Sequence, residues 1–260
     1  LKRSRLLICL YEPVCKNTCI ERLRLWMACR PPTVSAHMPT GLGKMAQTKI
    51  LGLVQVKGGA GRSTVATNLA GELARVGTVA LIDADMPQGT SASWAALRLQ
   101  DKPEGRLRAD TAQGHREMVA MVERLRGQVD YIVLDGPPRI AEMTRAILAL
   151  SDLALIPIGA SPAEIWATAD MVPQVHEVQK IHRVPVRILW TRFRAYTRLA
   201  QDLGSEADKA LGLPVMRSIL GYRVAYQEAL GAGRTAAELQ DPTAREEVVA
   251  LAVEVKRMLR

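Results

Sequence analysis

Short apolar runs alternate with helix-length segments from Ile50 to the C-terminus. The apolar runs are ILGLVQV, TVALIDA, DYIVLD, LALIPI, VRILWTR and VMRSI, which begin at residues 50, 78, 130, 153, 186 and 215. We expect helices near 63–76, 113–126, 140–150, from about 162, near 197–211 and from about 242 to 259. Strands that are apolar along their whole length are typical of parallel sheets covered on both faces. The pattern predicts an α/β fold with a single doubly wound, mostly parallel sheet and helices on both faces.

The first 44 residues differ from the rest of the chain. They hold all four cysteines (Cys9, Cys15, Cys19 and Cys29), in spacings that do not match the paired knuckles of structural zinc sites. They lack helical or strand periodicity, so we expect residues 1–44 to be a disordered or upstream extension. Residues 45–260 have a length that suits one domain, and their lack of cysteine is typical of a cytosolic protein.

The formal charge of +9 is unevenly spread along the sequence. Residues 1–44 hold eight basic and two acidic residues, so the predicted domain carries only 27 basic against 24 acidic ones. Within that domain, residues 180–234 hold ten basic and four acidic residues. This local excess is the part of the charge that can bear on a polyanionic partner.

A glycine-rich stretch, KGGAGRST, occupies residues 57–64 between the first apolar run and the first expected helix. In that position, glycines let backbone N–H groups approach phosphates, and the helix N-terminus favours an anion. A P-loop normally has lysine before its Ser or Thr, but here Arg62 precedes Ser63 and a lysine, Lys57, stands at the entrance. Arginine keeps the charge and can bridge phosphate oxygens, although its planar fork is bulkier. The stretch predicts a phosphate-binding loop, and the alternative is a glycine-rich turn without a ligand.

Carboxylates follow two further apolar runs. LIDADMPQG carries Asp83 and Asp85, and DYIVLDGPP carries Asp135. The carboxyl ends of parallel strands meet at one edge of the sheet, so we expect these side chains to converge with the glycine-rich loop. One such carboxylate can hold Mg²⁺ directly or through water, and another can orient an attacking water. Each alone could equally be a helix cap or turn residue.

These motifs, together with SDLALIPIGASPAEIWA at residues 151–167, resemble the ParA-type partition ATPases of the deviant-Walker ParA/MinD superfamily. The resemblance covers roughly residues 48–259 and is to the short form without an N-terminal helix-turn-helix domain. It implies ATP and Mg²⁺ as cofactors and a homodimer that forms with ATP. It further implies a cytoplasmic, nucleoid-associated protein that binds DNA without sequence preference and is stimulated by a ParB-like adaptor. The function so implied is partition of plasmid, chromosome or other cargo.

The resemblance also implies roles for particular residues. Lys57 would reach the phosphates of the partner subunit, Thr64 would contact the α-phosphate, and Asp85 would position the hydrolytic water. Ser63 would ligate Mg²⁺, with Asp83 and Asp135 holding the ion through water. The residues expected to bind the nucleotide are Lys57, Gly58, Gly59, Ala60, Gly61, Arg62, Ser63 and Thr64, and those expected to act in catalysis are Lys57, Arg62 and Asp85.

Two departures from the family pattern bear on hydrolysis. Arg62 replaces the P-loop lysine, and Met86 is an extra residue between Asp85 and Pro87, where we expect the loop to bulge. We expect a slow, adaptor-dependent ATPase, and the alternative is a nucleotide-binding switch or scaffold with little hydrolysis. The absence of cysteine excludes a bridging iron–sulfur cluster in the domain. No guanine-reading motif occurs, so we expect adenine, with contacts around residues 190–194 and after Leu220.

DNA contacts are expected from the basic stretch, at Arg192, Arg194, Arg198, Arg217 and Arg223. Any one of them could instead be a solvated surface charge. A second alternative is a MinD-like, membrane-associated positioning ATPase with an amphipathic terminal helix. The C-terminal apolar stripe is Val248, Leu251, Val255, Met258 and Leu259. It includes no Phe or Trp to lie among lipid headgroups, so we expect an ordinary packed helix and no membrane partner.

Overall fold

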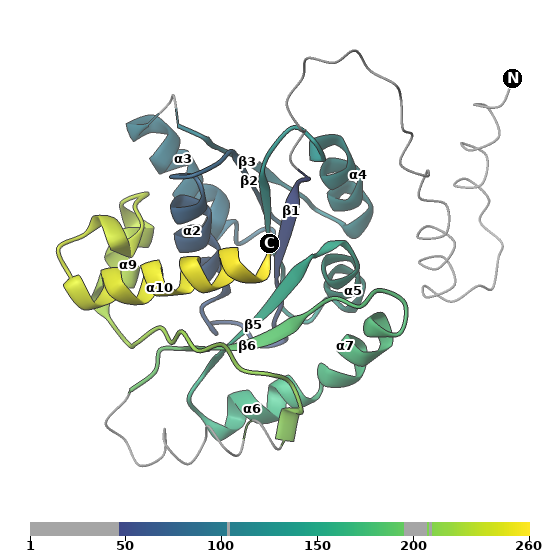
Figure 1. The fold of residues 1–260 in the computed structure, drawn as a ribbon. Helices are drawn as coiled ribbons and strands as arrows, with labels where there is room; N and C mark the ends of the chain where they lie inside the picture. Colours follow the sequence, from purple (N-terminus) through teal and green to yellow (C-terminus); the bar gives the residue numbers. More distant parts are fainter. Residues whose placement is uncertain (1–46, 103–104, 195–206, 208–209) are drawn as a thin grey trace, which may run out of the picture. The chain divides into compact units, whose positions relative to one another are not determined.

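A computed structural model describes residues 47–102, 105–194, 207 and 210–260 (Figure 1). Six strands form one sheet in the order β3-β2-β4-β1-β5-β6, and every neighbouring pair is parallel. The strands are β1 (Lys49–Leu53), β2 (Val79–Asp83), β3 (Leu107–Thr111), β4 (Tyr131–Asp135), β5 (Leu153–Gly159) and β6 (Val186–Thr191). The predicted α/β fold with a parallel sheet is therefore confirmed.

Helices cover both faces of the sheet (Figure 1). On one face lie α2 (Arg62–Leu73), α3 (Thr90–Asp101), α9 (Val224–Gly231) and α10 (Pro242–Met258), with the short 3₁₀ helix η2 (Ala236–Glu238) between the last two. On the other lie α4 (His115–Leu125), α5 (Ala141–Leu150) and α7 (Val172–Gln179), and α6 (Pro162–Ala169) follows β5. Apolar strands covered in this way are fully buried, as every residue of β2 and β5 is.

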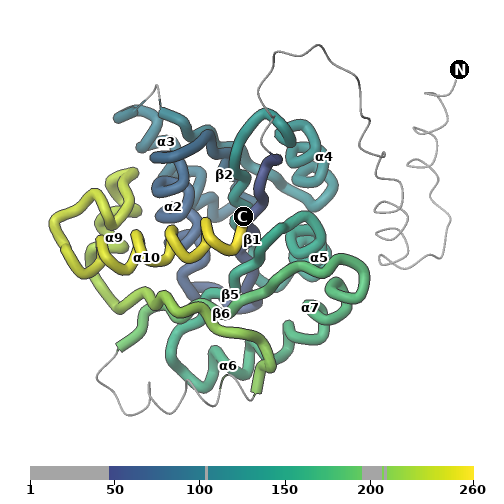
Figure 2. The backbone as a smooth tube through the Cα atoms, in the orientation of Figure 1, coloured from purple at the N-terminus to yellow at the C-terminus, as the bar shows by residue number. Residues whose placement is uncertain are grey.

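The C-terminal helix is part of the core. Val248, Leu251 and Val255 are fully buried, and Leu259 is nearly so. Figure 2 shows α10 crossing one face of the molecule, where it packs against α2 and η2. The expected packed helix is confirmed: its apolar stripe packs against the core, with Met258 only partly buried. Across the described ranges, no helix combines the length and apolarity needed to span a membrane.

Several elements differ from the sequence expectation. The VMRSI run is not a strand: Val215 makes only an isolated bridge to Ile188, and Arg217 is exposed. Five of the described elements were missed, namely α3, β3, α7, α9 and the short η2. The edge strand β3 has the half-exposed sequence LRADT, so it lacks the apolar run that marks the buried strands. Most of the helix expected near 197–211 lies outside the described residues, as do residues 1–46.

Candidate functional site

A cavity of about 640 Å³ lies where the central strands end. Residues 58–65, from the glycine-rich loop and the start of α2, form one wall. Asp85, Gln88 and Thr90 come from the segment after β2, and Thr191 and Arg192 from the end of β6. Residues 220–223 and α9 close the other side. Ligands of open α/β sheets bind at this edge, outside the carboxyl ends of the strands.

The glycine-rich loop is shaped to present its backbone. Gly59 and Gly61 have φ angles of 79° and 87°, in the left-handed region that side chains other than glycine rarely adopt. Gly61 is the N-cap of α2, and its carbonyl accepts from the N–H of Val65 at 2.9 Å. Thr191 fixes the loop to β6, because its hydroxyl donates to the carbonyl of Ala60 at 2.8 Å. The first N–H groups of α2 therefore face the cavity, an arrangement that favours an anion.

Arg62 lines the cavity, but its guanidinium is already hydrogen-bonded to oxygens of the protein. Its side chain is only 6% exposed, and its Nη2 donates to Asp85 Oδ2 at 2.9 Å. Its Nη1 donates to the backbone carbonyl of Gln55 at 2.8 Å, and its Nε lies 3.9 Å from Asp135 Oδ1. The guanidinium is thus held against the carboxylates at the ends of β2 and β4.

The two strand-end carboxylates lie side by side, as neighbours in the register of β2 and β4, and both are fully buried. Asp83 accepts from the N–H groups of Asp85 at 3.0 Å and Ala92 at 2.9 Å, so it orders the turn that follows β2. Asp135 Oδ2 accepts from the Ser91 hydroxyl at 2.6 Å, but its Oδ1 has no hydrogen-bond partner among the described residues. Burial raises the pKa of Asp135 to about 6, against the opposing effect of the Ser91 hydrogen bond.

The extra residue Met86 is accommodated in a turn. The N–H of Gly89 donates to the carbonyl of Asp85 at 2.9 Å, the Met86–Pro87 peptide is cis, and Met86 is exposed. Asp85 itself stays beside Arg62. Burial raises the pKa of Asp85, and the charge of Arg62 opposes that shift.

A comparison with protein families identifies the chain. The family described as "ATPase MipZ" matches residues 49–192, more than half of the sequence. The chain belongs to the MipZ family of ATPases. The predicted resemblance to ATPases of the ParA/MinD type is thereby confirmed.

Curated relatives of this MipZ-family chain include two bacterial proteins. A maintenance of carboxysome distribution protein A from Halothiobacillus neapolitanus is 25% identical over 70% of this chain and 84% of its own length. The chromosome-partitioning ATPase Soj of Thermus thermophilus is 27% identical over 74% of this chain and 89% of its own.

Among solved structures, a Cyanothece McdA–ATP complex matches with a TM-score of 0.67 at 17% identity, covering 81% of this chain and 97% of that one. Pyrococcus furiosus MinD matches with a TM-score of 0.64 at 18% identity over 81% and 99%. At these identities, the two structures show a shared fold.

The site of this MipZ-family member includes residues that the sequence analysis missed. Gln55 is fully buried, donates to the carbonyl of Pro157 at 2.9 Å, and offers its own carbonyl to Arg62. Ser91 bonds Asp135, and Tyr226 lines the cavity while its hydroxyl donates to Glu247 at 2.6 Å. A polar Gln inside the apolar run LVQV was a signal that could have been noticed, but Ser91 and Tyr226 carry none.

The arginines expected to bind DNA occupy different places. Arg192 and Arg223 line the cavity, and each is paired with a carboxylate, Arg192 with Glu164 and Arg223 with Glu247 at 2.7 Å. The Arg194 guanidinium lies 4.6 Å from the centre of the Tyr222 ring, a cation–π contact. Arg217 is exposed, and Arg198 lies outside the described residues. The expected adenine region, residues 190–194 and the segment after Leu220, supplies Thr191, Arg192 and residues 221–223 to the cavity wall.

Proposed function

We propose that this chain is an ATP-dependent positioning ATPase whose ATP-bound homodimer binds DNA without sequence preference. A ParB-like adaptor on the cargo would trigger hydrolysis and release. The observation that carries the proposal is one cavity lined by the glycine-rich loop, the first turn of α2 with Arg62, and Asp85, with the buried Asp135 carboxylate 3.9 Å behind the Arg62 guanidinium. Phosphoryl transfer needs that combination, because cations and N–H groups hold the phosphates while a carboxylate orients water.

The residues present fit Mg²⁺. Asp135 has a fully buried oxygen, Oδ1, that lacks a hydrogen bond within the described part of the chain. A cation would satisfy that oxygen, and Ser63 at the start of α2, whose hydroxyl lies close enough to lower the pKa of Asp135, would offer that hydroxyl to the same ion. Asp83 uses both oxygens to bond backbone N–H groups, so it would act on the ion through water. Bound Mg²⁺ would neutralise charge that develops on the phosphates, and it usually keeps several waters.

Lys57 is suited to act on a second copy of the chain. It is partly exposed at the entrance of the loop and does not line the cavity of its own chain. Nor does it form an ion pair with any of the described residues. In a dimer that buries two nucleotides face to face, its ammonium would contact the partner's phosphates. ATP would then favour the dimer more than ADP, because the γ-phosphate adds negative charge for the partner's Lys57 to contact.

The position of Arg62 supports slow, partner-stimulated hydrolysis. The carboxylate proposed to orient the hydrolytic water, Asp85, is bonded to the Arg62 guanidinium. Hydrolysis would therefore require Arg62 to turn toward the phosphates and release Asp85, a step that an adaptor could assist. The same ion pair favours the second candidate, a nucleotide switch with little turnover. Measured turnover with and without DNA and adaptor separates the two.

DNA binding would rest on the exposed basic residues of the stretch 180–234. Arg217 is exposed, whereas Arg192 and Arg223 are already paired with glutamates at the cavity. The curated relatives are named for different cargo, carboxysomes in one case and chromosomes in the other, so we leave the cargo as plasmid, chromosome or another body. We propose a cytoplasmic, nucleoid-associated location.

Electrophoretic retardation of random-sequence DNA tests the proposal. With ATP and Mg²⁺ we expect retardation that weakens steeply as salt rises, and with ADP we expect little. Arg217→Ala should weaken it, while Arg116→Ala, an exposed arginine on α4, should not. Equal affinity with ATP and ADP would refute the nucleotide-controlled switch. Calorimetry that detected no Mg²⁺-dependent ATP binding would refute the function as a whole.

A further inference from the structure

A second cavity, of about 770 Å³, lies at the other end of α2 from the glycine-rich loop. Its wall includes Gly71, Ala74 and Arg75 at the C-terminal end of that helix, whereas the nucleotide cavity takes the first turn. A helix of 12 residues is about 18 Å long, so the two cavities are separate. Gly105, Arg106 and Leu107 come from the start of β3, at the amino ends of the strands.

The wall of this second cavity is strongly basic. Five basic side chains line it, and only one carboxylate does, that of Glu238; the basic residues are Arg75, Arg98, Lys102, Arg106 and Arg245. They come from α3, from α10, from the residues just after α2 and α3, and from the segment before β3. Arg106 and Arg245 have no carboxylate within ion-pair distance in the described ranges; Arg245 donates only to the backbone carbonyls of Ala237 and Leu239.

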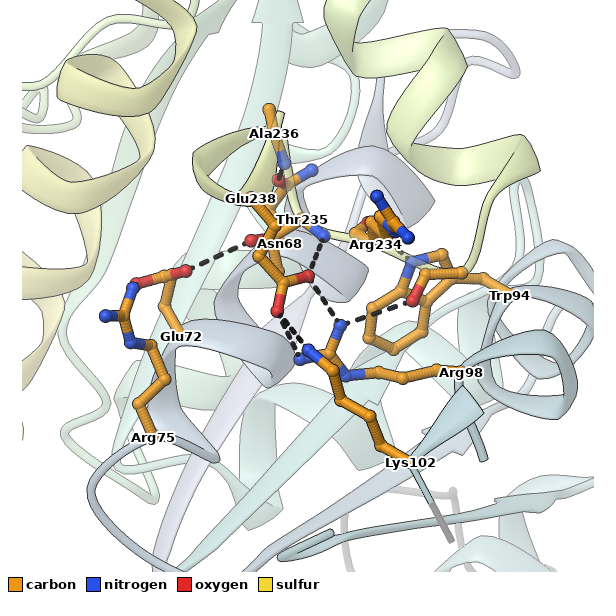
Figure 3. A network of polar contacts seen from close by, with 11 residues as sticks. Asn68, Glu72, Arg75, Trp94, Arg98, Lys102, Arg234, Thr235, Ala236 and Glu238 are labelled. Atoms are coloured by element: carbon orange, nitrogen blue, oxygen red, sulfur yellow. Dashed lines mark hydrogen bonds and ion pairs between the residues drawn. The ribbon is translucent and has the colours of Figure 1, made fainter. Parts of the chain in front are cut away.

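Arg98, Lys102 and Glu238, which we call the floor of the cavity, belong to one network of hydrogen bonds and ion pairs (Figure 3). Arg98 has a side chain only 9% exposed, and it donates to both oxygens of Glu238, at 2.8 and 3.1 Å. It also donates to the carbonyl of Gly233 and lies 5.3 Å from the centre of the Trp94 ring. Lys102 donates to Glu238 at 2.8 Å as well, so one carboxylate is shared by two cations. Two cations against one carboxylate leave a net positive charge on the floor, and the hydrogen bonds hold it in a fixed position.

We propose that this cavity binds a small phosphorylated molecule, with its phosphates on the basic wall and its organic part against Leu99, Leu107 and Val249. The volume is in the range of small-ligand sites, which are mostly apolar with a few fixed polar groups. Arginine forks bind phosphate oxygens in pairs, and the five cations outnumber the two carboxylates that pair with them, Glu238 and Glu72, which bonds Arg75 at 3.3 Å. A DNA duplex is too stiff and wide to enter a hollow of this size and reach Arg98. The nucleotide cavity plays no part in this binding.

Calorimetric titration of the full chain with inorganic pyrophosphate, with Mg·ADP present to fill the nucleotide cavity, tests the proposal. We expect one further pyrophosphate to bind, and binding to weaken about tenfold in the Arg75→Ala/Arg106→Ala variant, whose altered side chains are exposed. The matched control is Arg116→Ala/Arg124→Ala on α4, which lines neither cavity and should change affinity less than twofold.

Two outcomes would overturn the proposal. Pyrophosphate that is displaced by Mg·ADP and still binds the Arg75→Ala/Arg106→Ala variant occupies the glycine-rich loop instead. If the same variant loses retardation of random-sequence DNA but keeps its affinity for pyrophosphate, the basic wall is a nucleic-acid surface and not a small-molecule site. Both results are independent of whether the chain hydrolyses ATP.

Discussion

Replacing Arg62 with lysine should speed ATP hydrolysis, because the arginine holds the carboxylate that hydrolysis needs. The guanidinium bonds Asp85 at 2.9 Å and the carbonyl of Gln55 at 2.8 Å, through two different nitrogens of one planar fork. A hydrogen bond to a charged group contributes about 1.5–3 kcal/mol to stability. Turning Arg62 toward the phosphates gives up at least that contribution, which corresponds to roughly a 10- to 150-fold lower population of the turned state.

A lysine at this position has a single ammonium nitrogen and cannot reproduce the fork. We therefore expect Arg62→Lys to release Asp85 and to raise the rate of ATP hydrolysis about tenfold or more. The assay is turnover of radioactive ATP at saturating concentration, with ATP affinity measured separately by calorimetry. Arg124→Lys on α4 makes the same substitution at an exposed position and should leave turnover unchanged.

A second variant, Asp85→Asn, separates release of Asp85 from a general loosening of the loop. Asp85→Asn also removes the ion pair but deletes the carboxylate, so ATP should bind at least as tightly while turnover falls. Turnover of Arg62→Lys within twofold of the unsubstituted chain would show that arginine is tolerated and that the pair does not limit hydrolysis. A rise in turnover for both variants would show that Asp85 does not position the water.

Three further perturbations have defined outcomes. Asp135→Asn removes the buried oxygen that fits a cation, so ATP affinity measured by calorimetry should lose its dependence on Mg²⁺; unchanged dependence would remove Asp135 from the metal site. Burial raises the pKa of Glu238, but the bonds from Arg98 and Lys102 outweigh that effect and hold the pKa at about 2, below its usual 4.5, so its contribution is present above pH 4.5 and lost as the pH falls toward 2. Glu238→Gln should lower the free energy of unfolding at pH 7 by about 1–3 kcal/mol, discounted for partial exposure, with a smaller difference near pH 2, in urea denaturation. Deleting residues 1–44 should leave ATP affinity unchanged; loss of binding would show that they belong to the nucleotide domain.

The sheet could be predicted because its strands are buried on both faces. A strand such as β5, with all seven residues buried, must be apolar throughout, and that property is visible in the sequence. The edge strand β3 has one neighbour, β2, and its residues Arg108 and Asp110 are partly exposed. The sequence of β3 therefore carries no apolar run. The helix α9 was missed for a related reason: it is short, and its apolar residues do not gather on one face. Elements that are only half covered need the tertiary structure to be recognised.

The convergence of Asp83, Asp85 and Asp135 beside the loop could also be predicted, since parallel strands end at one edge. The contacts that those side chains make could not be predicted from the sequence. Whether Arg62 faces the cavity or the carboxylates depends on Gln55 and Asp85, which other segments bring to it. Motif spacing fixes the backbone position of a side chain, but the direction of a long, flexible one is decided by partners distant in sequence.

A count of charged residues along the sequence does not locate a basic surface, because it leaves out the ion pairs that those residues form with residues elsewhere in the chain. Arg192 and Arg223 contribute to the excess in residues 180–234, yet Glu164 and Glu247, which pair with them, lie outside that window. The cavity at the end of α2 shows the reverse: Arg106 and Arg245, which have no carboxylate within ion-pair distance among the described residues, are far apart in sequence, and no window of the chain reveals that they share one wall. Since the energy of an anion depends on unpaired charge within a few ångströms, the second arrangement should attract phosphates more strongly than the first. Comparing pyrophosphate affinity in Arg75→Ala/Arg106→Ala with that in Arg192→Ala, with the nucleotide cavity filled, tests that ranking directly.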